Sequence, residues 1–234
     1  MGENLKEIKY HIFIDRFNED SIVVDLGANV GQFSKIFSEI FPYKKIILIE
    51  ADSNLIKDIK SNLKDIKNVK IINAAVGNEL KEKVDFYLSK DSESSSLNKN
   101  FRDIFGINDK PNFVNVKMIT IDKIFKMFDI KKIDLLKIDI EGSEWDILEK
   151  FSKKEFEQIE QISVEFHDFI DPSLRYRTKK CIKRLKKLGY FFIHRRGEFM
   201  HETPYKDCLF FKAKFPLLIY LKFYFNSLKT LFKQ

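Results

Sequence analysis

The stretch "VVDLGANVG", residues 23–31, decides the fold expected of this 234-residue chain. An apolar run leads directly into a glycine turn, as a buried strand does before a helix. A dinucleotide-binding turn reads G-x-G-x-x-G, and its middle glycine lets the backbone approach a pyrophosphate. Here Gly27 and Gly31 are present, but Asn29 stands at the middle position and Asp25 precedes the turn. The turn therefore predicts a ligand that needs a nearby carboxylate and no pyrophosphate cradle.

Apolar runs and helical patterns alternate along the rest of the chain. Strands are expected at 21–27, 45–50, 69–77, 84–89, 133–142 and 159–167, and in the closing stretches "YFFIHR" (190–195) and "DCLFFKA" (207–213). Helices are expected at 31–41, at 53–63 with Ser53 as N-cap, at 143–151 and at 172–189. The alternation predicts an α/β fold in which helices cover both faces of a mostly parallel sheet. Ligands of such sheets bind at the carboxyl ends of the strands.

The composition fits one globular domain in a reducing compartment. Hydrophobic residues make up 44% of the chain, and 42 Lys and Arg against 35 Asp and Glu give a net charge of +7. This excess is compatible with a nucleotide-sugar, nucleic acid or membrane lipid as partner, or with a lysine-rich surface that has none. Cys181 and Cys208 lack metal-type spacing, and no secretory signal is present. A cytoplasmic protein is expected, with the inner face of the membrane as an alternative.

The tips of the next two strands carry groups that suit an adenosine. Glu50 ends the second strand, 23 residues beyond Gly27, where a carboxylate can accept hydrogen bonds from both ribose hydroxyls. The third strand ends in Asn73 and Ala74, a small site with a polar edge that suits an adenine rim. S-adenosylmethionine has a ribose, an adenine and cationic groups but no phosphate, which explains why the middle glycine is dispensable.

These motifs together resemble those of the FkbM family of S-adenosylmethionine-dependent methyltransferases, within the Rossmann-like class I methyltransferases. The matching stretches are "VVDLGANVGQFS", "IEADSNL", "NAAVG", "SSSL" (94–97), "VKMITIDKIF" (116–125), "IDLLKIDIEGSEWDIL" (133–148) and "ISVE" (162–165). The resemblance implies a seven-stranded mostly parallel sheet with an antiparallel closing strand. It also implies O-methylation of a sugar hydroxyl, in a nucleotide-activated sugar or a surface polysaccharide.

The resemblance assigns residues to the cofactor. It implies that the methionine part is lined by Asp25, Gly27, Asn29 and Gly31, that Glu50 and Ala51 lie at the ribose, that Asn73 and Ala74 border the adenine, and that Asp139 lies near the transferred methyl group. For Asp25 the alternative is a turn carboxylate, and for Glu50 it is a solvent-facing strand end.

Asp139, Glu165 and His167 are the candidate catalytic residues. They come from strands expected to be neighbours, about 4.8 Å apart, and offer two carboxylates and an imidazole. Such a set could hold one Mg²⁺ or Mn²⁺ ion, which would lower the pKa of an acceptor hydroxyl. The alternatives are an unaided base, His167 or Asp139, or ordinary polar residues at strand ends.

Two further segments are candidates for substrate contacts. The polar stretch 90–100, continuing irregularly to about 113, is expected to form a lid over the site. His194, Arg195, Arg196 and His201 flank the loop between the closing strands, where arginines suit a sugar diphosphate or form a solvated basic loop.

The chain is expected to divide into a methyltransferase domain, residues 1–213, and a C-terminal amphipathic cationic helix, residues 214–234. The latter could lie on an anionic membrane surface, form a homodimer contact or pack on its own domain. Its apolar run is too short to span a bilayer.

Other functions remain as competitors. A nucleic-acid methyltransferase is disfavoured because "DIEG" replaces the D/N-P-P-Y/F tip and neither cysteine follows a proline. A dinucleotide oxidoreductase is disfavoured by Asn29. A methyltransferase for another small molecule, a lipid or RNA stays open, as does a cofactor-binding protein without catalysis.

Overall fold

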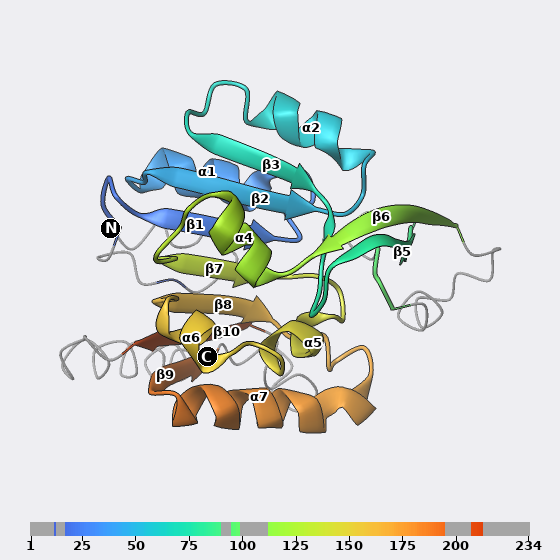
Figure 1. Cartoon of the computed structure of the whole chain (residues 1–234), viewed down its shortest axis with the longest axis vertical. Coiled ribbons are helices and arrows are strands. Elements are labelled where there is room, and N and C mark those ends of the chain that lie inside the picture. The colour runs from blue at the N-terminus through green and yellow to red at the C-terminus, as the bar shows by residue number, and fades with distance from the viewer. Residues whose placement is uncertain (1–11, 13–16, 90–94, 99–111, 195–206, 213–234) are drawn as a thin grey trace, which may run out of the picture.

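The computed structural model describes residues 12, 17–89, 95–98, 112–194 and 207–212. A seven-stranded sheet runs through it in the order β3-β2-β1-β7-β8-β10-β9 (Figure 1). In that order the strands are β3 (Val69–Asn73), β2 (Lys45–Glu50), β1 (Ile22–Leu26), β7 (Leu135–Ile138), β8 (Gln161–Glu165), β10 (Asp207–Lys212) and β9 (Tyr190–His194). The strands from β3 to β8 are parallel, and β10 pairs antiparallel with both neighbours. The predicted Rossmann-like sheet with an antiparallel closing strand is confirmed.

Helices cover both faces of the sheet because alternate strand residues are apolar on each side. The helices are α1 (Gln32–Ile40), α2 (Leu55–Asn62), α4 (Ile121–Met127), α5 (Glu144–Leu148), α6 (Lys153–Glu157) and α7 (Arg175–Lys187). On one face, Val23 of β1 belongs to a cluster that includes side chains of α1 and α2 such as Phe37 and Ile59. On the other face, Val24 belongs to a cluster that includes Trp145 and residues of α4 to α7.

A second, smaller sheet was not predicted. It has the order β4-β6-β5, with β4 at Ala75–Val76, β6 at Phe113–Ile119 and β5 at Lys81–Tyr87. The stretch 69–77, expected to be a strand followed by a turn, therefore holds two strands, since β3 ends at Asn73 and β4 belongs to the second sheet. The expected exposed strand 84–89 corresponds to β5, which projects with β6 beyond the carboxyl ends of the main strands (Figure 1).

The N-terminus of α2 also differs from the prediction. Its N-cap is Asn54 rather than Ser53, and the Asn54 backbone N–H donates to Asp52 Oδ1 at 2.9 Å. Asp52 therefore forms the turn that starts the helix. Residues 214–234, expected to form a helix of their own, lie outside the described residues. None of the helices described is long and apolar enough to cross a membrane.

Candidate active site

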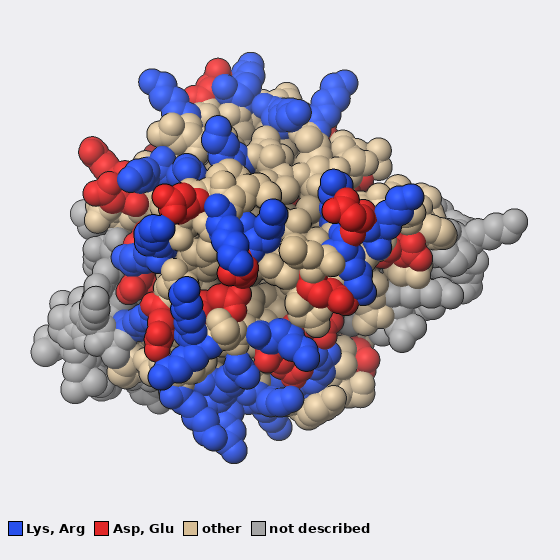
Figure 2. All heavy atoms as spheres, in the orientation of Figure 1, with Lys and Arg blue, Asp and Glu red and all other residues tan. Residues whose placement is uncertain are grey.

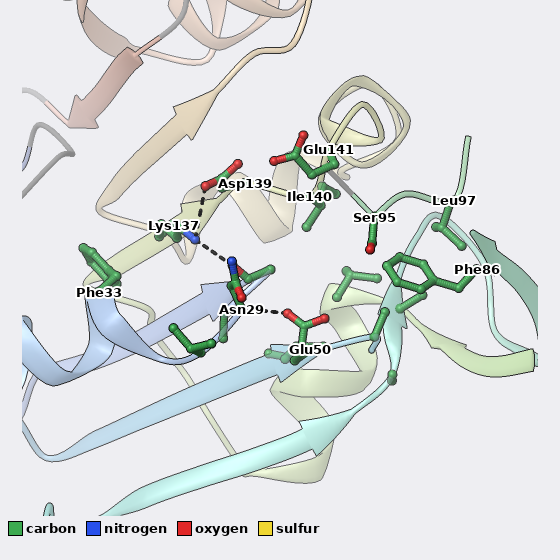
Figure 3. A pocket seen from close by; sticks show the side chains of 18 of the residues that line it. Asn29, Phe33, Glu50, Phe86, Ser95, Leu97, Lys137, Asp139, Ile140 and Glu141 are labelled. Carbon is green, nitrogen blue, oxygen red and sulfur yellow. Dashed lines mark hydrogen bonds and ion pairs between the residues drawn. The ribbon is translucent and has the colours of Figure 1, made fainter. Parts of the chain in front are cut away.

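A cavity of about 360 Å³ opens at the carboxyl ends of β1, β2 and β7 (Figure 3). This size falls within the range of small-molecule sites, roughly 300–1,000 Å³. Six of the residues predicted to bind cofactor line it: Gly27, Asn29, Glu50, Ala51, Ala74 and Asp139. Three others lie outside its lining: Asp25, Gly31 and Asn73.

The glycine turn brings β1 and β7 together at the cavity floor. Gly27 has a φ of +72°, and a Cβ at this position would lie 1.7 Å from the carbonyl oxygen of Asp139. Only glycine fits this close approach. Two residues later, Asn29 adopts the left-handed conformation with a φ of 49°, which asparagine tolerates better than most residues. Its backbone N–H donates to Glu50 Oε2 at 2.7 Å.

Glu50 is the polar centre of the cavity. Its side chain takes one backbone N–H on each oxygen, from Asn29 on Oε2 and from Asp52 on Oε1 at 2.8 Å. Burial raises the pKa of Glu50, while the two backbone donors oppose that rise. Each carboxylate oxygen keeps a second lone pair. The group can therefore accept two further hydrogen bonds from a bound diol.

Apolar side chains close the far side of the cavity. Ala74, Ala75, Val76, Phe86 and Leu97 line it, with Ser95 beside them. The Asn73 amide was predicted to border an adenine, but it donates to the backbone oxygens of Glu50 and Ala51 at 2.9 and 3.0 Å. Asn73 thus fixes the end of β2, while Ala74 lines the cavity itself.

Lys137 was not identified from the sequence. It lies in β7 with its side chain 4% exposed, 3.2 Å from Asp25 and 3.6 Å from Asp139, and it donates to the Gly27 carbonyl at 2.8 Å. Burial would lower the pKa of Lys137, but Asp25 and Asp139 raise it. The available signal was its position between Leu136 and Ile138 in a strand expected to be buried. A buried lysine requires a carboxylate partner, so this position indicates an ion pair inside the fold.

Asp25 lies in the core, next to the cavity residue Lys137. Its carboxylate is fully buried, and it accepts a hydrogen bond from Ser34 Oγ of α1 at 2.7 Å. Burial raises the pKa of Asp25, and the neighbouring ammonium of Lys137 opposes this. Asp25 therefore does not line the cavity itself; it pairs with Lys137, which does.

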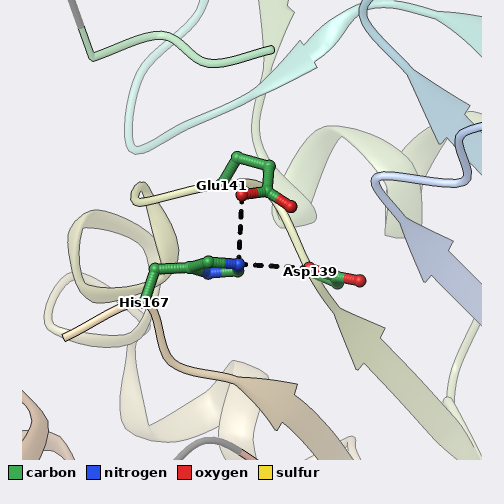
Figure 4. Close-up of side chains that lie close together, drawn as sticks. All are labelled: Asp139, Glu141 and His167. Carbon is green, nitrogen blue, oxygen red and sulfur yellow. Dashed lines mark ion pairs between the residues drawn. The ribbon is translucent and has the colours of Figure 1, made fainter. Parts of the chain in front are cut away.

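Three side chains that could ligate a metal ion converge beside the cavity (Figure 4). The ligand atoms of Asp139, Glu141 and His167 all lie within 4.8 Å of one another. His167 Nε2 lies 3.1 Å from Glu141 Oε2 and 3.7 Å from Asp139 Oδ1. Asp139 and Glu141 also line the cavity, so this group adjoins the space where a ligand would bind.

Glu144, at the start of α5, holds the His167 ring in place. Its carboxylate is fully buried and lies 2.9 Å from His167 Nδ1, and it also accepts the backbone N–H of Gly142 at 3.0 Å. Burial alone would lower the pKa of His167, but Glu144 and Glu141 raise it well above its usual range. The Nδ1 contact leaves Nε2 directed at Asp139 and Glu141.

The predicted ligand set differs from this group in one member. Glu165 ends β8 and is buried, but the group contains Glu141 in its place. The negative charge of Glu165 instead contributes to raising the pKa of Lys137. Glu141 has a φ of 49° and precedes Gly142 at 92°, and this left-handed turn brings the Glu141 side chain to His167.

Parts of two other predictions lie outside the described residues. Of the expected lid, Ser95–Asn98 and residues 112–113 are described. Ser96 is paired with Tyr87 through both backbone hydrogen bonds, and its hydroxyl donates to the Glu141 carbonyl. Arg195, Arg196 and His201 lie outside the described residues, as does the His194 side chain.

The strand order and the cavity at the strand tips, with a carboxylate at the end of β2, define a Rossmann-like α/β fold with a ligand site at its usual place. The crystal structure of methyltransferase FkbM from Methylobacillus flagellatus KT superposes with a TM-score of 0.52 at 16% identity, over 84% of this chain and 44% of that one.

The sequence family narrows this class. A model of the methyltransferase FkbM domain matches residues 25–192. This chain belongs to the FkbM family of S-adenosylmethionine-dependent methyltransferases.

Two curated proteins are similar in sequence. Methyltransferase 1 of Beauveria bassiana is 24% identical over 182 residues, which cover 69% of this chain and 73% of that protein. The AMB antimetabolite synthetase AmbE of Pseudomonas aeruginosa is 21% identical over 248 residues, covering 88% of this chain and 12% of that protein. The chain thus spans a small part of the synthetase and less than half of the superposed FkbM structure.

Proposed function

We propose that this protein transfers a methyl group from S-adenosylmethionine to a sugar hydroxyl, in a nucleotide-activated sugar or a glycan, with the assistance of a divalent metal ion. One observation carries the proposal: Asp139 and Glu141 both line the cavity and adjoin His167. The site for a cofactor and the groups that handle an acceptor hydroxyl are therefore adjacent.

The residues around the cavity fit the cofactor. Glu50 can accept both ribose hydroxyls while keeping its two backbone donors, and the apolar rim from Ala74 to Val76, with Phe86, suits an adenine. At the other end, Asp139 and Glu141 favour the positive charge of a sulfonium. When bound, S-adenosylmethionine supplies a methyl group on a cationic sulfur.

The reaction is a displacement at the methyl carbon. The acceptor oxygen forms a bond to carbon as the carbon–sulfur bond breaks, and the sulfur keeps the electron pair. The hydroxyl proton has to leave: a metal ion would lower the pKa of the hydroxyl, and Asp139 would be the base at the cavity in an enzyme that works without the ion. Lys137 lies 3.6 Å from Asp139 and places a positive charge beside that carboxylate.

The metal proposal is supported by ligand spacing and by Glu144. Ligands about 2.1 Å from one octahedral ion lie about 3 Å apart at adjacent positions, close to the 3.1 Å between His167 Nε2 and Glu141 Oε2. A carboxylate on the second ring nitrogen is the usual support of a metal-binding histidine, and Glu144 provides it. Asp139, Glu141 and His167 would hold the ion, which would lower the pKa of the acceptor hydroxyl and orient it.

The acceptor is tested with cofactor carrying an isotope-labelled methyl group. Purified protein is incubated with a panel of nucleotide-sugars and glycans, and the products are analysed by mass spectrometry. Labelled methyl on a sugar oxygen is expected, and Asp139→Asn should lower its formation. Label found only on RNA or lipid would contradict the sugar assignment.

The metal is tested separately, by turnover after chelation and by the metal affinity of two variants. Chelation should abolish turnover without removing cofactor affinity, and Mg²⁺ or Mn²⁺ should restore turnover. Glu141→Gln should weaken metal affinity, whereas Glu165→Gln, outside the group, should largely retain it. Full activity after exhaustive chelation would contradict the metal role. His167 would then act in its protonated form, bridging the carboxylates.

A further inference from the structure

Helix α7 carries a row of lysines on its outer side. Lys179, Lys183 and Lys187 are four residues apart, so they lie in line along the helix about 6 Å from one another. All three are exposed, and none has an acidic partner among the residues described. Lys186 lies beside them. Figure 2 shows Lys and Arg gathered along the edge that α7 forms in Figure 1. We call these four residues the outer lysine row.

On the flank of α7, Arg177 and Lys180 have acidic partners. Arg177 pairs with Asp146 at 2.8 Å and Glu149 at 2.9 Å, and Lys180 lies 3.7 Å from Glu149. The core side of the helix is formed by Thr178, Cys181, Ile182 and Leu185. Lys186 lies over the Phe192 ring, 5.0 Å from its centroid. Contacts within the fold therefore explain the flanking charges and Lys186, but they do not explain why Lys179, Lys183 and Lys187 stand in one exposed line.

The last described residue of the sheet, Lys212, lies close in the fold to the end of α7. Lys212, the last residue of β10, is paired with Tyr190, which lies three residues after the end of α7. In the sequence, residues 213–234 contain six aromatic residues, four lysines and no Asp or Glu. In the sequence, a second cationic and apolar segment thus follows β10 directly.

We propose that the outer lysine row docks this protein on an anionic membrane surface. Lysines at a bilayer surface gain attraction from acidic headgroups, and the aromatic and apolar composition of the sequence after Lys212 suits the interface. A nucleic acid would favour the planar, bidentate guanidinium of arginine, whereas this row contains only lysine. The proposal goes beyond methyl transfer and does not depend on it.

The test is flotation of the full chain with lipid vesicles. Vesicles of phosphatidylcholine alone are compared with vesicles that also contain phosphatidylglycerol, at low and high salt. The test variant combines Lys179→Gln, Lys183→Gln and Lys187→Gln. The matched control combines Lys57→Gln, Lys60→Gln and Lys64→Gln, which removes three exposed lysines in and next to α2, at the opposite edge of the sheet. Thermal unfolding verifies that both variants fold.

Binding to anionic vesicles alone, weakened by salt, is expected of the wild type. At about 1 kcal/mol for each lysine, the α7 variant should partition on the order of 100-fold more weakly, and the α2 variant should bind nearly as the wild type. The proposal is overturned by no binding to anionic vesicles, by equal binding to neutral ones, or by equal losses in the two variants. An RNA gel shift that depends on the α7 lysines, without vesicle binding, would also overturn it.

Discussion

At the scale of single residues, Glu50 and Asn29 explain why the glycine turn lacks its middle glycine. Asn29 reaches the left-handed conformation without being glycine, and this conformation directs its N–H at the Glu50 carboxylate. The turn therefore orients a carboxylate for a ribose, where a dinucleotide turn would expose backbone to a pyrophosphate.

Glu50→Gln should weaken binding of S-adenosylmethionine by about 2 kcal/mol, or roughly 30-fold, because hydrogen bonds to a charged acceptor are lost. Isothermal titration calorimetry measures the change. Glu79→Gln, which removes a charge from an exposed residue paired with Lys81, serves as control and should bind normally. Unchanged affinity of Glu50→Gln would remove this residue from the ribose site.

Lys137→Met should destabilise the fold by roughly 3–5 kcal/mol, because it leaves the buried Asp25 carboxylate without its cation. Adding Asp25→Asn to this variant should recover part of the loss. Denaturant unfolding gives both values. Lys126→Met breaks an exposed pair with Asp122 and should cost about 1 kcal/mol or less. Similar losses of unfolding free energy at the two lysines would mean that the buried ion pair stabilises the fold no more than the exposed one.

Residue types at strand tips could be predicted from the sequence, but side-chain directions past a strand end could not. Asp139 and His167 were placed correctly next to each other by strand order alone. Glu165 was grouped with His167 because residues two apart share a strand face. His167 lies beyond the end of β8, where that alternation no longer applies, and the left-handed turn at Glu141 supplies the second carboxylate. Nothing in the local pattern predicts this backbone conformation.

At the scale of elements, the contact between β1 and β7 depends on one missing side chain. Gly27→Ala should destabilise the protein by more than Gly189→Ala, although both glycines have positive φ values of 72° and 94°. A Cβ at Gly189 has no atom within 4 Å, so that change should cost only the conformational penalty of about 1–2 kcal/mol. At Gly27 the new Cβ clashes with the Asp139 carbonyl. Denaturant midpoints compare the two, and equal losses would contradict the close-approach argument.

The segment Ser95–Asn98 is the described part of the predicted lid. Ser95 and Leu97 line the cavity, while Ser96 ties the segment to β5. Adding S-adenosylhomocysteine should slow hydrogen exchange of these amides, because a ligand against Leu97 opposes local opening. Exchange in α2, which does not line the cavity, should stay the same. Unchanged exchange in Ser95–Asn98 would contradict a lid role for this segment.

Elements with strong periodicity were predictable, and the second sheet was not. The parallel strands of the main sheet are short runs rich in β-branched and other apolar residues, and α1 and α7 have clear helical spacing. In β6 exposed and less exposed residues alternate, and in β5 such alternation begins only after three exposed residues. That pattern predicts a half-exposed strand but gives no partner, since pairing is decided by contacts distant in sequence. The pairing of Ala75 and Val76 with β6 is invisible for the same reason.

At the scale of the whole molecule, the cavity and the two lysine-bearing helices α2 and α7 lie at three different sides of the sheet. The cavity lies at the carboxyl ends of the central strands, α2 lies at the β3 edge, and α7 with the outer lysine row lies near the β9 edge (Figure 1). The charge excess was compatible with an anionic partner or with a lysine-rich surface that has none, and it gave no place for either. The fold places the lysine row away from the cavity, so surface binding and methyl transfer can be tested independently.

The central claim is that the cavity at the strand tips holds the cofactor in one orientation. A crystal structure with S-adenosylhomocysteine tests this most directly. The ribose hydroxyls should contact the Glu50 carboxylate, the adenine should lie against Ala74 and Phe86, and the sulfur should lie toward Asp139. Electron density for the ligand outside this cavity, or a ribose turned away from Glu50, would contradict the account.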